Sequence, residues 1–216
     1  MKRTIALGAA VLLVTWCAGA QAGSSPSPAV PRTAASLPHD QHEGLTVSAD
    51  PYLEAARAKG KFGKANPLPA GILPVEVFLR NETAQPIRIP LNGIQLVIHF
   101  PDGQHQNLGR LAAADVAGAV AHPGGSPTPR ARRFPVGLGA SADHKADKLA
   151  EILVPLALDA DIVPPMATIH GFLFFDLGRD LALGREASLY LPEATTVPSN
   201  RPLMFFEVFF GTPAQP

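Results

Sequence analysis

The sequence has few of the residues that thiol or nucleic-acid chemistry requires. Its 216 residues include one cysteine and one tryptophan. A single cysteine cannot form an intramolecular disulfide, so the fold has to be stabilised by its core. Basic and acidic residues balance at 18 each, which gives a formal net charge of zero. Because nucleic-acid binders usually carry a basic excess, we expect no nucleic acid as a partner.

Long apolar runs are also scarce, and the only one lies at the N-terminus, over residues 5–14. Lys2 and Arg3 precede it, and the small-x-small sequence AQA follows it at residues 20–22. This order is typical of a secretory signal peptide. We expect the signal peptide over residues 1–22, with cleavage at its last residue or two residues earlier. The run is too short for a transmembrane helix, so we expect an exported chain, periplasmic or extracellular, without a transmembrane segment.

Cleavage at that site would remove the only cysteine. Acylation of Cys17 would need a small residue before it, and Trp16 stands there. We therefore do not expect a lipid anchor on Cys17. The mature chain should have no thiol chemistry, and we expect no cofactor.

Proline and glycine are abundant, at 23 and 19 residues. Such numbers favour a mainly β chain with many turns. Residues 23–43 consist largely of Ser, Pro and Ala and are predicted to be a disordered linker. One domain is expected over residues 44–211, followed by a short tail at 212–216.

Alternating apolar residues predict strands over residues 45–50 and 72–81. The alternation then changes phase at Asn92-Gly93. The pair forms either a tight hairpin turn or a bulge that carries the chain from one sheet to the other, and we favour the second. A weaker strand is expected at 104–108, after the Asp102-Gly103 turn.

Residues 110–155 differ from the rest and are predicted to be a partly helical insertion. An Ala-rich helix is expected at 111–121, and a second helix at 143–154 with Asp143 as its cap. Between them, residues 122–142 read as a Pro- and Gly-rich loop. Three C-terminal strands should follow, at 167–177, 186–191 and 202–210.

Four stretches carry a family resemblance: GLTVSADPY, FGKANPLPAGILPVEVFLRNET, PPMATIHGFLFFDL and ASLYLP. Their order resembles that of exported bacterial proteins of unknown function that carry an immunoglobulin-like domain. The resemblance covers residues 44–211. It implies a mainly β fold, an immunoglobulin-like antiparallel β-sandwich, with the helical insertion between its N-terminal and C-terminal strands. It implies export but no substrate.

The stretch HGFLFFDLG at 170–178 is apolar on both faces. Such a strand has to be covered on both faces. We expect it beside the 186–191 strand, with Leu173 and Phe175 in the core. Phe172 and Phe174 should lie under the helical insertion. If they are bare, they become a possible partner surface.

The densest cluster of potential metal ligands is HDQHE at 39–43. His39 and His42 have a spacing that can reach one transition-metal ion. The alternative is a solvated linker segment without a metal role.

Other candidate groups are dispersed along the chain. His99, Asp102 and His105 flank a turn, where the alternative is that Asp102 caps its own backbone. His170 lies inside an apolar strand. It is expected to be hydrogen-bonded or to lie at the sheet margin, as a structural histidine rather than a catalytic base. A deep pocket containing two or more of these residues, or one of them with Asp176, would favour an enzyme.

A basic group in the long loop could contact an anionic membrane surface or a polysaccharide, although a solvated loop is the alternative. It consists of Arg130, Arg132 and Arg133. The sequence contains no Gly-x-Ser-x-Gly motif, and Ser126 lies in the same loop, where a nucleophile is poorly held. No catalytic residues are predicted.

These observations favour an exported, non-enzymatic binding or assembly module of the cell envelope. Its partner would be an envelope protein or a polysaccharide. The first alternative is an envelope hydrolase whose groups converge only in three dimensions. The second is a periplasmic metal-binding protein that uses the N-terminal histidines.

Overall fold

The structure, a computed structural model, describes residues 36–123, 143–178 and 180–211. It is mainly antiparallel β, as the sequence predicts, with one large and one small sheet. The large sheet has the strand order β1-β2-β3-β8-β6-β5-β9-β11, and the small sheet has the order β10-β4-β7. The signal peptide predicted at 1–22 and the tail predicted at 212–216 lie outside the described residues.

The bounds of the elements are as follows. The strands are β1 (His39–His42), β2 (Leu45–Pro51), β3 (Ile72–Asn81), β4 (Ile87–Arg88), β5 (Gln95–His99), β6 (His105–Leu111), β7 (Ile162–Val163), β8 (Thr168–Asp176), β9 (Ala187–Leu191), β10 (Thr195–Thr196) and β11 (Phe206–Phe209). The α-helices are α1 (Ala55–Phe62), α2 (Ala113–Ala121) and α3 (His144–Leu153). Short 3-10 turns are η2 (Gly63–Ala65), η3 (Leu68–Ala70), η4 (Leu91–Gly93), η5 (Val154–Leu156) and η6 (Leu181–Glu186).

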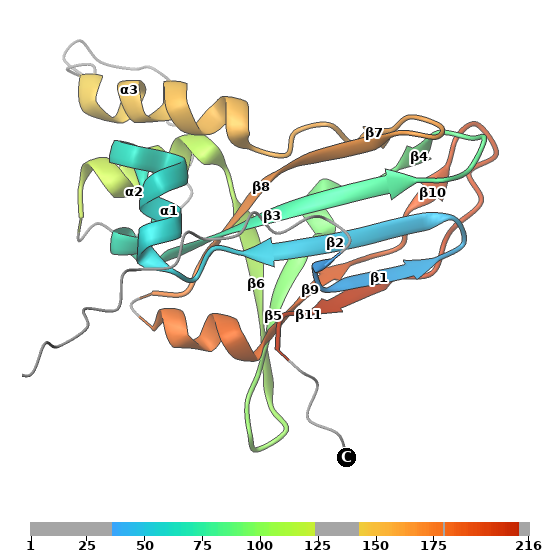
Figure 1. The fold of residues 1–216 in the computed structure, drawn as a ribbon, viewed down its shortest axis with the longest axis horizontal. Coiled ribbons are helices and arrows are strands. Elements are labelled where there is room, and N and C mark those ends of the chain that lie inside the picture. The colour runs from blue at the N-terminus through green and yellow to red at the C-terminus, as the bar shows by residue number, and fades with distance from the viewer. Residues whose placement is uncertain (1–35, 124–142, 179, 212–216) are drawn as a thin grey trace, which may run out of the picture. The chain divides into compact units, whose positions relative to one another are not determined.

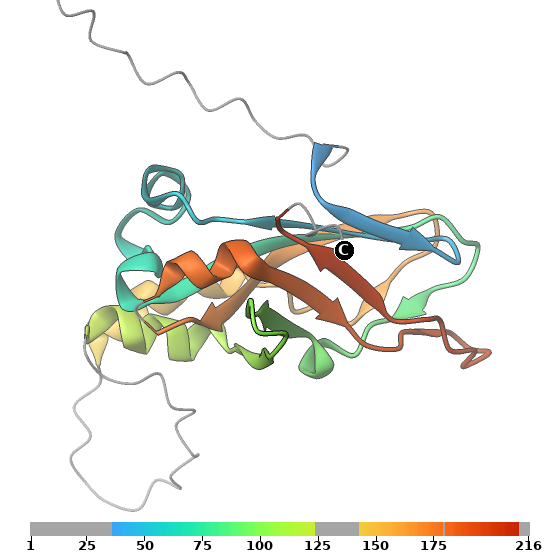
Figure 2. The ribbon, with the colours of Figure 1, turned by 90° about the horizontal axis from the view of Figure 1, so that it is seen from below.

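The large sheet folds back on itself into two layers that share strand β6. The first part of β6 pairs with β5, whereas its last two residues, Arg110 and Leu111, pair with β8. Strands β1, β2, β3 and β8 form one layer, and β5, β9 and β11 form the other (Figure 2). The two edge strands of the sheet, β1 and β11, thereby come to lie side by side (Figures 1 and 2).

Alternation along the strands decides which side chains enter the core. Val47 on β2 pairs with Leu79 on β3, and both are fully buried. Their neighbours in sequence point to the outer face, where Thr46 pairs with Arg80. Such period-2 burial is expected of a strand that packs on one face.

The position of β8 in the sheet differs from the prediction. Strand β8 lies between β3 and β6, and β9 lies between β5 and β11, so these two strands are not neighbours. The expectation that β8 lies beside the 186–191 strand is therefore wrong. Alternation indicates which face of a strand is buried, but it carries no information about which strand pairs with it.

The second apolar face of β8 is buried, as predicted. Phe172 is 2% exposed and Phe174 is 1% exposed, so the expectation that they form a partner surface if bare does not apply. The aromatic rings that pack on them from other elements belong to α1 and to Tyr52 before it, and not to the 110–155 insertion that is expected from the sequence to cover them. The ring of Phe62 lies 4.9 Å from that of Phe172, and the ring of Tyr52 lies 5.1 Å from it. Helices α2 and α3 extend the same helical end of the molecule by contacting η3 and η2 (Figure 1).

The helical insertion has the predicted form. The Asp143 side chain caps α3 by accepting a hydrogen bond from the Ala146 amide at 3.2 Å. His122, at the end of α2, lies 2.6 Å from the same carboxylate, and this bond lowers the pKa of Asp143. This contact therefore links the C-terminal end of α2 to the N-terminal end of α3, the two ends that the long loop connects. Most of that loop lies outside the described residues, including Arg130, Arg132 and Arg133.

Two connections settle predictions about the chain path. Strand β4 belongs to the small sheet and β5 to the large one, so Asn92-Gly93 carries the chain between sheets, as favoured. It does so in the 3-10 turn η4 rather than in a bulge. Strand β1 falls within the predicted linker 23–43 and pairs with β2, which corrects the linker's C-terminal boundary. Residues 23–35 of that predicted linker lie outside the described residues.

Gly171 on β8 is required by a close approach of the backbone. The Leu158 amide donates to the Phe172 carbonyl at 3.0 Å, so this segment lies along the edge of β8 that β6 does not reach. A Cβ at position 171 would lie 2.7 Å from the N and Cα atoms of Leu158. Only glycine leaves room for this contact.

Candidate functional surfaces

The HDQHE stretch closes the sheet at the junction of β1 and β11. The Asp40 carboxylate accepts the Glu207 amide at 3.0 Å, and the Glu43 carboxylate accepts the Met204 amide at 2.7 Å. The ring of His42 stacks on Phe206 with 3.8 Å between centroids. These side chains occupy backbone donors of an edge strand that would otherwise be open to another chain. The cluster therefore has a structural role.

This geometry does not support the predicted metal site at His39 and His42. In a strand, residues three apart point to opposite faces. His39 lines the outer face of its layer, whereas His42 lies against Phe206 of β11. Within residues 36–123, 143–178 and 180–211, no three His, Cys, Asp or Glu side chains are placed to hold a metal ion.

The outer face of β9 and β11 carries exposed rings, and we call Tyr190, Phe205 and Phe209 the aromatic face. Phe205 is 49% exposed and Phe209 is 40% exposed. The rings of Tyr190 and Phe205 are 5.7 Å apart, and His99 lies 5.5 Å from Phe209. Met204, adjacent in sequence, is 64% exposed. Contiguous exposed apolar side chains usually mark an interaction site.

A chain of polar side chains crosses the aromatic face. The hydroxyl of Ser188 donates to Glu207 at 2.7 Å, and Nε2 of His99 lies 2.9 Å from the same hydroxyl. In a nucleophilic triad the acid holds the other ring nitrogen and the hydroxyl is accessible. Here Glu207 lies 3.7 Å from the same Nε2, and Ser188 is fully buried. The three groups are thus arranged as a hydrogen-bonded chain and not as a triad.

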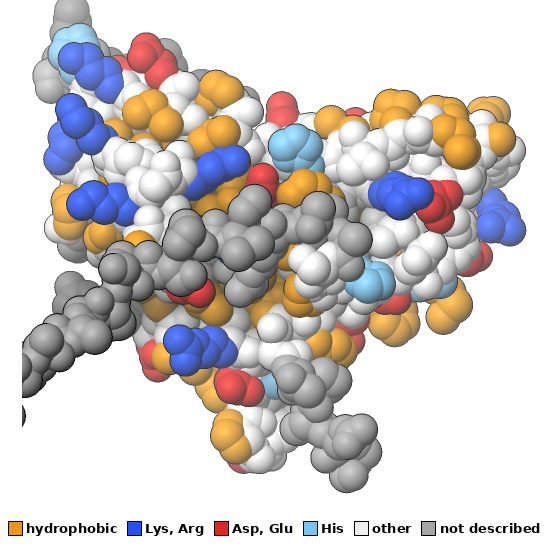
Figure 3. Space-filling model, viewed as in Figure 1, with side chains coloured by type: hydrophobic (Ala, Val, Ile, Leu, Met, Phe, Trp, Pro, Cys, Tyr) orange, Lys and Arg blue, Asp and Glu red, His pale blue; other side chains and the backbone are white. Residues whose placement is uncertain are grey.

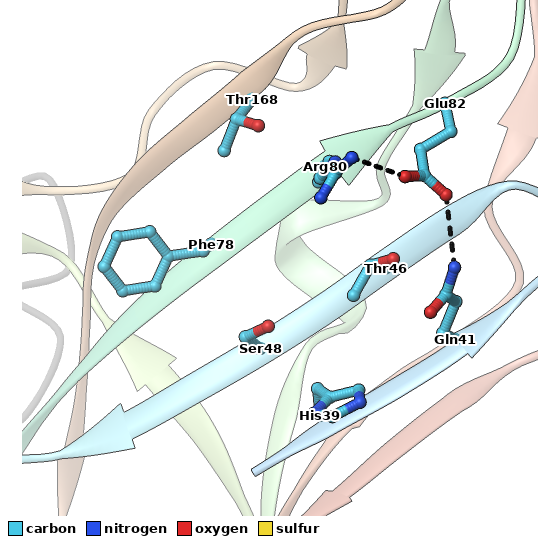
Figure 4. A pocket seen from close by; sticks show the side chains of 8 residues that line it. All are labelled: His39, Gln41, Thr46, Ser48, Phe78, Arg80, Glu82 and Thr168. Atoms are coloured by element: carbon cyan, nitrogen blue, oxygen red, sulfur yellow. Dashed lines mark hydrogen bonds and ion pairs between the residues drawn. The ribbon is translucent and has the colours of Figure 1, made fainter. Parts of the chain in front are cut away.

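The outer face of the other layer contains an open groove of about 490 Å³. We call it the polar groove. Its lining comes from β1, β2, β3 with the residue that follows it, and β8: His39, Gln41, Thr46, Ser48, Phe78, Arg80, Glu82 and Thr168 (Figure 4). In the space-filling view of this face, Lys and Arg gather over the helical end (Figure 3). The groove itself contains one basic and one acidic side chain, Arg80 and Glu82.

A buried polar cluster lies beyond the polar groove, against α1. The Tyr52 hydroxyl donates to Glu76 at 2.8 Å. Both Lys61 and His170 place a nitrogen 3.7 Å from the other oxygen of this carboxylate. Arg57 donates two hydrogen bonds to the buried Asp50 and lies over the Tyr52 ring. The cluster thus fastens α1 to β2 and β3.

The Tyr52 phenol has a pKa raised to about 12 from 10.0, first by burial and then by its hydrogen bond to Glu76. The unfolded chain releases this proton near pH 10, whereas the folded chain holds it to about pH 12. The free energy of unfolding should therefore fall as the pH rises through this interval, by about 2–3 kcal/mol from this group. Denaturant unfolding across the interval measures it. In Tyr52→Phe this decrease of about 2–3 kcal/mol, the size expected of one phenol, should be absent, whereas Tyr190→Phe should still show it. Equal decreases in the two variants would contradict the assignment of the raised pKa to Tyr52.

The other residues predicted for a site do not converge in either of the two grooves. Asp102 accepts the Gln104 amide at 3.0 Å, so it caps its own turn as the alternative held. His99 and His105 pair across β5 and β6, away from His170. His170 has a side chain that is 61% exposed, so it lies at the surface and not in the strand's buried part. None of these residues, nor Asp176, lines the polar groove or the groove beside β4, which includes Arg88 and Asp161.

Sequence reasoning missed the buried cluster and misplaced the exposed rings. Residues 202–210 are apolar on both faces, as 170–178 are, and this pattern is a local signal for Phe205 and Phe209. The cluster had no such signal, because Tyr52, Glu76 and Lys61 belong to three separate elements.

The comparisons with known proteins give no match: no family model, no curated protein and no solved structure is significantly similar to this chain. Among the described helices, none is both long enough and apolar enough to cross a membrane.

Proposed function

We propose that this chain is an exported, non-enzymatic binding module of the cell envelope that docks an envelope protein through its aromatic face. The exposure of Phe205 and Phe209, which lie on the same outer face on either side of Glu207, carries the proposal. Burying a phenylalanine is worth about 1.5–3 kcal/mol, so a partner that covers both rings gains substantially. Aromatic side chains are also the residues that most often dominate binding energy.

The polar chain within the aromatic face supports specificity. Ser188, Glu207 and His99 already satisfy one another, so covering them leaves no unpaired group. Remaining acceptor positions of Glu207 can take donors from a partner. Protein interfaces combine buried apolar area with several hydrogen bonds, and the exposed rings together with Glu207 offer both.

Export and the immunoglobulin-like class belong to the same proposal. Their support is the signal-like sequence at 1–22, the resemblance over 44–211, and the two-layered arrangement of the large sheet. The hydrolase alternative has no support in the His99, Ser188 and Glu207 arrangement, and the metal-binding alternative has none in the positions of His39 and His42.

Capture of envelope proteins by the wild-type chain and by Phe205→Ser/Phe209→Ser tests the proposal. We expect the double variant to lose at least about tenfold of one specific captured protein, which corresponds to roughly 1.4 kcal/mol. Met166→Gln is the matched control, because it removes an exposed apolar side chain elsewhere. Equal capture by the double variant, with both proteins folded, would refute the proposal.

A further inference from the structure

The polar groove follows from the register of four strands. Pairing places its side chains in two rows that cross the sheet. The first row is His39, Ser48 and Phe78, and it continues on β8 with His170, beyond the lining. The second row is Gln41, Thr46, Arg80 and Thr168. Short Ser and Thr side chains on β2 lie between longer ones on β1 and β3. This order of sizes hollows the outer face along β2.

Phe78 lines one side of the groove, and His170 stacks on this ring from beyond the lining. The rings of Phe78 and His170 are stacked, with 5.4 Å between centroids and 17° between planes. His170 is held near Glu76 and still exposes most of its side chain. The Phe78 ring is half-buried, and its accessible part is an apolar surface on which the C–H groups of another ring can pack.

The other wall carries planar polar groups that are already fixed. The Glu82 carboxylate accepts from Arg80 at 2.7 Å and from Gln41 at 3.1 Å, which joins β1 to the end of β3 (Figure 4). Arg80 and Gln41 each have further N–H donors beyond these bonds. Side chains fixed before binding lose less entropy when a ligand arrives.

The charge and position of the groove narrow the class of ligand. Glu82 neutralises Arg80, so an anion such as phosphate finds no unpaired cation in the lining. The groove lies on a sheet face where the backbone of β2 and β3 is already paired, so a peptide cannot bind by strand addition there. What fits is a neutral molecule with an apolar ring face and hydroxyls around its rim.

We propose that the polar groove binds a neutral carbohydrate. A pyranose ring packs on Phe78, and its hydroxyls bond to Gln41, Arg80 and Thr168. The volume of about 490 Å³ falls in the range typical of ligand sites. The groove and the aromatic face lie on the outer faces of different layers. A negative result for sugar binding would therefore leave the proposed protein partner untouched, and the reverse also holds.

Calorimetric titration of the mature protein with neutral oligosaccharides tests the site. The probes are maltotetraose, cellotetraose and chitotetraose, with inorganic phosphate and a polar tetrapeptide as comparisons, each to about 10 mM. We expect at least one oligosaccharide to bind. Phe78→Ala, which removes the stacked ring, and Thr46→Trp, which fills the groove, should each weaken that binding at least about tenfold.

Arg88→Ala, in the groove beside β4, is the control and should bind the sugar like wild type. Thermal unfolding of every variant shows which variants are folded. If Phe78→Ala does not fold, Thr46→Trp still tests the site. The proposal is overturned if no oligosaccharide binds, if Thr46→Trp binds as wild type does, or if only phosphate or the peptide binds.

Discussion

Phe172→Ala should lower the free energy of unfolding by about 3–5 kcal/mol, because the ring is buried on the outer face of β8 beneath α1. The ring contacts Tyr52, Phe62 and Phe174, and the ammonium of Lys61 lies 5.1 Å from its centroid. Its removal leaves a cavity between the sheet and the helix that neither can fill. Chemical denaturation measures the loss.

Phe209→Ala is the matched control for Phe172→Ala. It removes the same side chain from a strand of the same sheet, but from an exposed position, so we expect a loss of about 1 kcal/mol or less. A loss from Phe209→Ala as large as that from Phe172→Ala would contradict the distinction between a covered face of β8 and an open face of β11.

Gly171→Ala should destabilise the fold by about 3 kcal/mol. Its new Cβ would meet backbone atoms of Leu158 at 2.7 Å, and backbone cannot move aside as a flexible side chain can. We expect the bond from Leu158 to Phe172 to lengthen or break. Hydrogen exchange at the Leu158 amide, together with unfolding by denaturant, would show both effects.

Gly109→Ala, on strand β6, is the control for Gly171→Ala, since a Cβ there meets nothing within 4 Å. Its effect should be close to neutral, because alanine restricts the unfolded chain without a clash in the folded one. Similar effects of the two substitutions would mean that the path of residues 157–158 along β8 is wrong.

The sequence predicts those strands and helices whose signal lies within a few consecutive residues. The alternation over 72–79, the Asp143 cap and the Ala-rich stretch before it correspond to β3, α3 and α2. Helix α1 has no comparable local signal in the sequence. It has eight residues and buries just Ala58 and Phe62, which is too little for a periodic signal.

The candidate site was less predictable, because it depends on pairing between distant strands. His39 and His42 suggest one ion only if the conformation is ignored; once β1 forms, the strand separates them. The sequence predicts that His170, which lies in an apolar stretch, is hydrogen-bonded or lies at the sheet margin. On β8 it pairs with Phe78 of β3, at a position that α1 does not cover. The sequence around a strand residue does not indicate whether a helix covers that residue.

The most direct test of the proposed binding surface is photo-crosslinking within the native cell envelope. A photoreactive phenylalanine analogue would replace Phe209 in the full chain, with the same analogue at Met166 as the comparison. A discrete protein adduct from position 209, weakened by Phe205→Ser and absent from position 166, is the expected result. No adduct from position 209, or the same adducts from both positions, would contradict a protein-binding role for the aromatic face.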